Sequence, residues 1–221
     1  MRFQSAIVRA IRLFPPIEKK LIVIAELLGY QQWVAELPGV PKGCSSRERV
    51  WDEVRNLLSR GERVHVLEFG VAWGYMTKSW FDSRDEIIEK WDGYDRFTGL
   101  PRSWRDLDAG AFDAGGIPPA LTDDRLTWHV GDVEETLSSS IENFSLSGQQ
   151  RVLYVFDLDL LEPSLHCWNV VRPFLKGGDL LYFDEAFDRD ERELIERHVL
   201  TSGIELQAVA YSTTCLLLKV S

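Results

Sequence analysis

Two groups of residues in this sequence have types and spacings that could do chemistry. The first is the stretch Glu68-Phe-Gly70-Val-Ala-Trp-Gly74, in which an acid precedes small residues at alternate positions. Small residues let the backbone pass close to a ligand and start a helix directly behind it. A nucleotide-like cofactor suits such a turn. The acidic Glu68 is unfavourable beside a pyrophosphate, so the pattern favours a cofactor with a cationic end.

The second group consists of four acids that close two hydrophobic runs, Asp157 and Asp159 after one and Asp184 and Glu185 after the other. Asp157 and Asp159 share a face by the period of two, unless the strand has already ended there. Four carboxylates meeting in a cleft repel one another, and the sequence places no Lys or Arg beside either pair. A divalent cation with oxygen ligands (Mg²⁺, Ca²⁺ or Mn²⁺) is the simplest compensation. The alternative is that these acids are solvated and cap the following helices.

Two further acids, Asp95 and Asp132, also follow hydrophobic runs. Asp95 is placed to accept both hydroxyls of a ribose, as an acid does at this position in dinucleotide folds. Asp132, directly after Gly131, is placed to meet an adenine edge. Turn formation or helix capping is the alternative for both acids.

Alternating strands and helices must position these residues. The expected strands are 64–71, 92–97, 126–131, 151–159 and 179–187, with helices at about 75–90, 133–142, 163–175 and 189–202. The central strands are nearly continuous hydrophobic runs, which is typical of a parallel sheet buried on both faces. Residues 204–211 and 215–220 form two more strands with no helix between them, so one strand runs antiparallel. We predict an α/β fold with a doubly wound, mostly parallel seven-stranded sheet and a C-terminal antiparallel hairpin strand.

Ligands bind outside the carboxyl ends of the strands in such a sheet, where the strand order reverses. The long segment 98–124, which is rich in Gly, Pro and Asp, follows the second strand there. A loop of this length is usually functional or disordered, and its residues Trp104 and Asp106 make it a candidate lid over an acceptor.

Residues 1–40 differ in character from the rest of the chain, because they carry an excess of basic residues among apolar ones. Pro15-Pro16 breaks a first short helix, and residues 21–28 predict a second. Three interpretations remain: a helix packed on the acidic surface of the protein, a dimer contact, or an interfacial membrane contact. The short first helix argues against strong membrane insertion. We expect a helical cap or an oligomerisation segment at 1–40, the latter giving a homodimer, and the main domain at 41–221.

The composition restricts the class of protein. The 221-residue chain has a net charge of −10, which argues against binding to nucleic acid. It has three scattered cysteines without a Cys-x-x-Cys pair, no apolar run of membrane-spanning length and no evident secretory signal. A reducing, cytoplasmic location is therefore expected.

Five ordered blocks give the chain from about residue 64 to 188 a resemblance to a known family. It resembles the class I S-adenosylmethionine-dependent methyltransferases, whose fold is Rossmann-like, and among them the macrocin-type sugar O-methyltransferases. The blocks are Glu68–Gly74, Tyr94–Pro101 (Tyr-Asp-Arg-Phe-Thr-Gly-Leu-Pro), Gly131–Leu137 (Gly-Asp-Val-Glu-Glu-Thr-Leu), Asp157–Ser164 (Asp-Leu-Asp-Leu-Leu-Glu-Pro-Ser), and Leu175-Lys-Gly-Gly178 leading to Asp184-Glu185.

The resemblance implies that Glu68 and Gly70 hold the methionine portion of S-adenosylmethionine and that Asp95 binds its ribose. Gly74 and Asp132 complete the predicted cofactor site, because all five residues fall at the ends of the first three expected strands. The resemblance also implies a metal ion, expected to be Mg²⁺, at Asp157, Asp184 and Glu185. Two positions depart from the family pattern: it usually has paired aspartates where Asp184-Glu185 stands and an aromatic residue where Leu161 stands.

These features predict O-methylation of a hydroxyl on a small molecule, a sugar or glycosylated metabolite, with divalent-metal assistance. Asp157 is the expected general base as well as a metal ligand, because a carboxylate in the metal's coordination shell lies within reach of a coordinated hydroxyl. The histidines His65, His129, His166 and His198 are alternative bases. A phenolic acceptor remains open. So do two other classes of protein: a nicotinamide-dependent oxidoreductase, and a cofactor-binding domain without catalysis.

Overall fold

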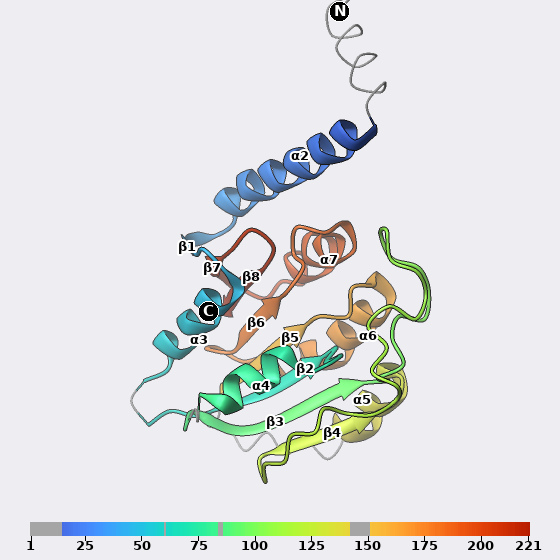
Figure 1. Ribbon diagram of the computed structural model, residues 1–221. Coiled ribbons are helices and arrows are strands. Elements are labelled where there is room, and N and C mark those ends of the chain that lie inside the picture. The colour runs from blue at the N-terminus through green and yellow to red at the C-terminus, as the bar shows by residue number, and fades with distance from the viewer. Residues whose placement is uncertain (1–14, 60, 84–85, 142–150) are drawn as a thin grey trace, which may run out of the picture.

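The computed structural model describes residues 15–59, 61–83, 86–141 and 151–221. Their strands form one eight-stranded sheet in the order β1-β7-β8-β6-β5-β2-β3-β4 (Figure 1). The strands are β1 (Gly39–Gly43), β2 (Val64–Phe69), β3 (Ile88–Asp95), β4 (Leu126–Val130), β5 (Arg151–Phe156), β6 (Leu180–Phe183), β7 (Leu206–Tyr211) and β8 (Leu216–Val220). The helices are α2 (Pro15–Glu36), α3 (Arg47–Leu57), α4 (Tyr75–Asp82), α5 (Val133–Ile141), α6 (Leu161–Val171) and α7 (Arg189–Leu194); short turns at Arg172–Phe174 and Ile195–Val199 extend the last two.

The order of the strands makes the sheet doubly wound, as predicted. The chain moves outward from β2 through β3 to β4, and then returns to the other side of β2 for β5 and β6. The reversal of strand order therefore lies between β2 and β5. Among the described strands only β8 is antiparallel to its neighbours, β6 and β7. This confirms the predicted hairpin at the C-terminal end.

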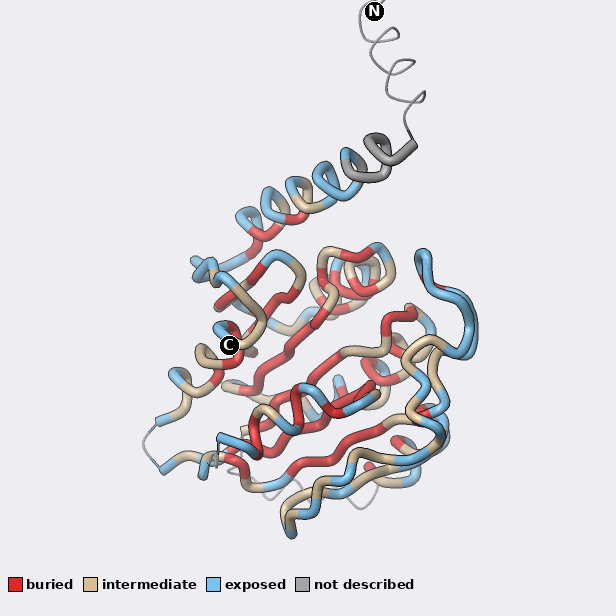
Figure 2. Tube along the Cα trace, viewed as in Figure 1, coloured by how far each residue is buried: buried red, intermediate tan, exposed pale blue. Residues whose placement is uncertain are grey.

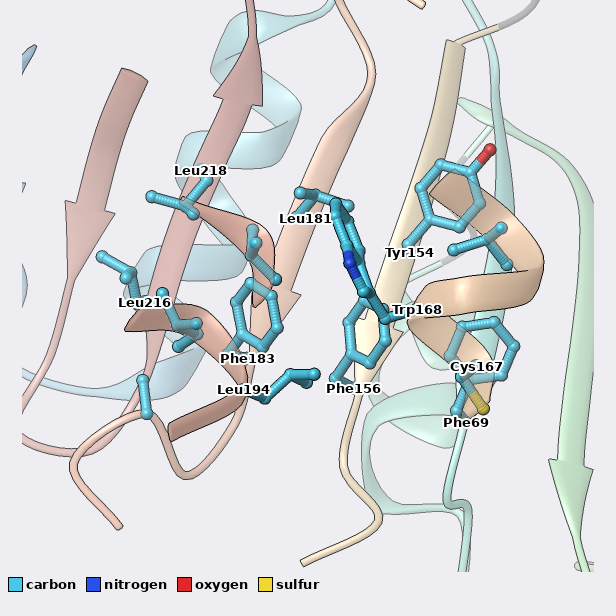
Figure 3. Packing of buried hydrophobic residues seen from close by; sticks show 14 of the residues in the cluster. Phe69, Tyr154, Phe156, Cys167, Trp168, Leu181, Phe183, Leu194, Leu216 and Leu218 are labelled. Atoms are coloured by element: carbon cyan, nitrogen blue, oxygen red, sulfur yellow. The ribbon is translucent and has the colours of Figure 1, made fainter. Parts of the chain in front are cut away.

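Helices cover both faces of the sheet because the central strands are apolar on both faces. Along β5, Tyr154 and Phe156 pack against α5, α6 and α7, whereas Leu153 and Val155 pack against α3 and α4. Figure 2 shows these strands buried along their length. In Figure 3, Phe156 stacks on Phe183 of β6, with ring centroids 4.9 Å apart. This packing fixes the neighbouring ends of β5 and β6, where the acids of the second group begin.

Several element boundaries differ from the sequence-based expectation. α4 ends at Asp82, and β3 begins at Ile88, four residues before the expected start at 92. The strands expected to extend to 159 and 187 end at Phe156 and Phe183. The acids that follow them therefore belong to loops rather than to strands, so their side chains need not alternate between the two faces of the sheet.

The N-terminal region adds a strand that was not predicted. β1 pairs in parallel with β7 at the edge of the sheet, and it crosses the expected domain boundary between residues 40 and 41. The predicted short helix at 21–28 is part of a longer helix, α2, which starts at Pro15, a favoured first position for proline. The helix expected before Pro15 lies outside the described residues. Among the helices of the described segments, none has the length and apolar character needed to cross a membrane.

Candidate active site

A cavity of about 810 Å³ opens at the carboxyl ends of the central strands, beside the reversal of strand order. This volume is large enough for a cofactor-sized ligand together with part of a second ligand. Seven of the eight predicted site residues line it: Glu68, Gly70, Asp95, Asp132, Asp157, Asp184 and Glu185. Gly74 does not. The tertiary structure thus brings together residues that are up to 117 positions apart in the sequence.

Glu68 is a buried carboxyl group at the end of β2, with 2% of its surface exposed. One of its oxygens accepts a short hydrogen bond from Thr77 and another, at 2.8 Å, from the indole of Trp91. Burial nevertheless raises the pKa of Glu68 to about 7, because these neutral donors do not balance the lost hydration. A cavity-lining acid in this state fits a ligand with a cationic end, whose ammonium would stabilise the charged form.

The turn after β2 is held by Asp95, the last residue of β3. One oxygen of Asp95 accepts hydrogen bonds from the backbone N–H groups of Val71 and Ala72, both at 2.7 Å, and the other accepts one from Phe97 at 2.6 Å. Ala72 takes a positive φ of 46° within this turn, a conformation that residues with a side chain rarely adopt. Asp95 therefore shapes the turn as well as facing the cavity.

Gly70 contacts the protein backbone more closely than expected. Its φ is +89°, and an added Cβ would lie 1.8 Å from the carbonyl oxygen of Asp157. This collision lies between the residues that directly follow β2 and β5, so a side chain at Gly70 would disturb the fold as well as a bound ligand. The main requirement for glycine at position 70 is therefore the close approach of the ends of β2 and β5.

Gly74 and Asp132 differ from the other predicted cofactor residues. Gly74 begins α4 with a φ of +71°, and a Cβ there would meet Pro119 at 2.7 Å. It therefore acts on the turn without lining the cavity. Asp132 lines the cavity with a largely exposed side chain and lies 3.6 Å from the guanidinium of Arg96.

The acids that follow β5 and β6 form a second wall of the cavity. Burial and the neighbouring Asp184 raise the pKa of Asp157 well above its ordinary value, and burial also raises the pKa of Asp184. Burial beside Asp184 raises the pKa of Glu185 to about 7. Asp157 and Asp159 do not share a strand face: the strand ends at Phe156, the exception that the sequence analysis allowed, and Asp159 takes a left-handed φ of 62°.

Two arginines that the sequence analysis did not identify neutralise part of this charge. Arg47, at the start of α3, lies 2.6 Å from Asp184 and 3.8 Å from Glu185. Arg105, in the long loop, lies 2.6 Å from Asp188 and 3.8 Å from Glu185. The sequence places no Lys or Arg beside either pair, but the fold brings these two guanidinium groups to the acids, so charge compensation by itself does not require a metal ion. No sequence signal points to Arg47, since it stands in the charged run Arg47-Glu-Arg49 typical of a solvated helix.

The predicted metal ligands, as they are arranged, do not fit a divalent ion. Both oxygens of Asp184 are engaged, one by the hydroxyl of Tyr182 at 2.6 Å and the other by Arg47. Across the described segments, no three acids, histidines or cysteines converge into a group that could hold a metal. A metal could reach Asp184 only if the guanidinium withdrew.

The long loop at 98–124 forms another wall. Trp104 is 9% exposed, and its indole N–H donates to Asp188 at 3.3 Å; Phe112 packs on Trp73 with centroids 5.9 Å apart. These three aromatic residues line the cavity, whereas Asp106 is exposed and does not. The loop is in place to contact an acceptor, and its function as a lid remains a prediction.

None of the four histidines lines this cavity. His65 and His129 both bind Asp92, at 2.6 and 2.8 Å, so they are part of the sheet. His166 lies in α6 and His198 in the turn after α7. Asp157 therefore remains the best placed of the candidate bases.

Comparisons with known proteins identify the fold. No model of a protein family matches this sequence, and neither does any of the curated proteins. Solved structures do match. The calicheamicin methyltransferase CalS11 is 22% identical with a TM-score of 0.58, covering 79% of this chain and 80% of that one. Its apo structure, described as a TDP-rhamnose 3'-O-methyltransferase, gives a TM-score of 0.54 over 79% and 81% at the same identity.

The O-methyltransferase NovP is 14% identical with a TM-score of 0.52, and the match covers 78% of this chain and 76% of that one. Identities this low show a shared fold. The sheet order, the cavity at the strand ends and these matches agree with one another. This chain therefore has the Rossmann-like fold of the class I S-adenosylmethionine-dependent methyltransferases, in the form found in CalS11 and NovP.

Proposed function

We propose that this protein is an S-adenosylmethionine-dependent O-methyltransferase that acts on a hydroxyl of a small molecule, a sugar or glycosylated metabolite. One observation carries the proposal. A single cavity of about 810 Å³ has the buried acid Glu68 and the turn at Gly70 on one side, and Asp157 with Asp184 and Glu185 on the other. A cofactor with a cationic end and an acceptor that must lose a proton would meet between these two sides.

The first side would hold the cofactor. Glu68 would bind the ammonium of the methionine portion, and Gly70 would keep the turn close to it. Asp95 would bind the ribose through Oδ1, which accepts one backbone N–H, whereas Oδ2 already accepts two. Asp132 would meet the adenine, and Gly74 would set the start of α4. S-adenosylmethionine, when bound, supplies a methyl group activated by its sulfonium.

The second side would hold the acceptor. The oxygen of the acceptor hydroxyl would take the methyl group, and Asp157 would accept the proton of that hydroxyl. This proton transfer needs the carboxylate within hydrogen-bond reach of the hydroxyl. Trp104 and Phe112 offer flat apolar surfaces to the rest of the acceptor, and burial of the reacting groups keeps water away from them. In this proposal the loop orients the acceptor, and Asp157, directly after β5, removes its proton.

Metal assistance at Asp157, Asp184 and Glu185 stays a prediction, and no step above depends on it. Exhaustive chelation tests it directly. If Mg²⁺ assists, chelation should stop methyl transfer and leave binding of S-adenosylhomocysteine nearly intact. Activity that survives chelation would show that the acids work without a metal.

The class of acceptor is supported by likeness alone. CalS11 is described as acting on TDP-rhamnose, which makes nucleotide-linked deoxysugars the first acceptors to test, with a catechol as the phenolic alternative. Neither the matches nor Glu68 supports the alternative of a nicotinamide-dependent oxidoreductase. A homodimer also remains part of the proposal.

Calorimetric titration with S-adenosylhomocysteine and with NAD, each with and without Mg²⁺, tests the proposed function. We expect S-adenosylhomocysteine to bind and NAD not to bind; the reverse would contradict the proposal. Asp157→Asn should lower kcat by about 10²–10⁴-fold while keeping the affinity for S-adenosylhomocysteine. Glu185→Gln should have a smaller effect, and Glu196→Gln, on the surface, should have none. Full affinity without transfer to any acceptor would favour a binding domain without catalysis.

A further inference from the structure

Arg47 is presented to the acidic wall by a rigid element. It is the first residue of α3, a helix anchored in the core by the fully buried Val50, Trp51 and Val54. Trp51 also packs edge-on against Tyr182 of β6, with ring centroids 6.5 Å apart. The start of the helix is therefore fixed beside the end of β6, and only the Arg47 side chain needs to move for its guanidinium to leave the acids.

The contacts of Arg47 occupy the donor atoms that a metal would need. Its guanidinium donates to one oxygen of Asp184 at 2.6 Å, while the hydroxyl of Tyr182 occupies the other. It also lies 3.8 Å from Glu185. The Arg47 side chain is 33% exposed and that of Asp184 only 5%. The guanidinium thus has a path to solvent, whereas the carboxylate would stay buried.

The second arginine at this wall, Arg105, also lies 3.8 Å from Glu185, but its shorter contacts are with other groups. Arg105 donates to Asp188 at 2.6 Å, and its guanidinium stacks over Phe187 and Trp104 at 4.4 and 4.7 Å from the ring centroids. Its withdrawal would break all three contacts. Arg47 is therefore the cation at this wall that can be exchanged.

We propose that Arg47 and a divalent cation compete for Asp184 and Glu185, so that Arg47 sets the metal affinity of the cavity. Two cations at the same buried carboxylates repel each other, and a metal must displace the guanidinium to bind. With Arg47 in place, part of the charge of the acids is compensated within the chain itself. The inference deepens the proposed function, because it concerns the acceptor side of the same cavity.

Binding of Mn²⁺ to the full chain tests this inference, followed by the loss of the signal of free Mn²⁺ in electron paramagnetic resonance. Arg47→Gln removes the charge and keeps an N–H donor for Asp184, and Arg47→Met is a second neutral variant. Arg47→Lys keeps the charge. Arg49→Gln is the matched control, since Arg49 lies on the same helix, is 70% exposed and pairs with Asp52 at 3.3 Å.

We expect both neutral variants to bind Mn²⁺ about ten-fold or more tightly than the wild type, with Arg47→Lys and Arg49→Gln within about three-fold of it. Equal or weaker binding by folded neutral variants would overturn the inference, as would equally tight binding by Arg47→Lys. Affinity for S-adenosylhomocysteine, measured on the same samples, shows that each variant is folded. If the wild type itself did not bind S-adenosylhomocysteine, that result would count against the proposed function and not against the role of Arg47.

Discussion

The carboxylate of Asp95, at the end of β3, accepts a hydrogen bond at 2.7 Å from the backbone N–H of Ala72 in the turn that follows β2. The same oxygen accepts the N–H of Val71, also at 2.7 Å. One side chain therefore holds the two backbone groups that shape the cofactor side of the cavity. A single substitution should disturb both the turn and the ligand.

Asp95→Asn tests this relationship. In one orientation of the amide, the NH₂ replaces the oxygen that accepts both N–H groups, and Val71 and Ala72 lose their acceptor. In the flipped orientation, the N–H of Phe97 loses its acceptor. We expect the free energy of unfolding to fall by about 1–3 kcal/mol and the affinity for S-adenosylhomocysteine to fall by about ten-fold or more. Urea unfolding and calorimetry measure the two effects. Loss of affinity with unchanged stability would mean that Asp95 acts on the ligand alone.

Gly70→Ala should destabilise the fold. The added methyl group would lie 1.8 Å from the carbonyl oxygen of Asp157, so the ends of β2 and β5 must separate. We expect a cost of about 3 kcal/mol or more. Gly203→Ala is the control, because Gly203 has a similar φ of +82° with open space around it, and should cost about 1 kcal/mol. Equal costs would show that the conformation, rather than the collision, matters.

Binding of S-adenosylhomocysteine should depend on pH through Glu68. Burial raises the pKa of Glu68 to about 7 in the free protein, and the ammonium group of the ligand needs the charged form of Glu68. Affinity should therefore be highest above pH 7 and fall as the pH drops through 7, by about ten-fold between pH 8 and 6. Calorimetry across this range measures it. Glu68→Gln should bind weakly with little pH dependence, and a flat wild-type profile would contradict the assignment.

Asp92→Asn should weaken the sheet itself. Although burial opposes its charge, hydrogen bonds from His129 and His65 and the ion pair with Lys90 hold the pKa of Asp92 below its ordinary value. A lowered carboxyl pKa stabilises the fold above the unfolded value of about 4 and loses that effect as the pH falls further. We expect a loss of about 2–3 kcal/mol at pH 7 that shrinks below pH 4, measured by urea unfolding. A loss of equal size at pH 3 and 7 would show that charge is not its source.

Deletion of residues 1–28 should leave the fold intact and reduce self-association. Leu21, Ile24 and Leu28 lie on one side of α2 and are between 41% and 56% exposed, whereas Tyr30 is the first buried residue among the side chains described on this helix. Sedimentation of this chain and of a control lacking residues 1–14 measures the association. If both sediment as the wild type does, this side of α2 is no dimer contact.

Deletion of residues 1–40, in contrast, should unfold the protein partly or wholly. The deletion removes the buried Tyr30, Val34 and Leu37 and part of β1, so neither the core nor the sheet is complete without residues 1–40. Circular dichroism of the two deletions separates the roles of the segments. A fully folded 41–221 chain would show that β1 is dispensable.

The sequence by itself determined the alternation of strands and helices, the hairpin at the end and the positions of Glu68, Asp95, Asp157 and Asp184 at strand ends. Each of these follows from local pattern, since burial on both faces of a parallel strand requires a continuous hydrophobic run that a polar residue must end. Only the tertiary structure decided that Arg47 meets Asp184, 137 positions away. The sequence around Arg47 does not indicate a contact with Asp184, and the sequence around Asp184 does not indicate a contact with Arg47. The contact exists because the core residues of α3 seat that helix beside β6, and no local periodicity carries that information.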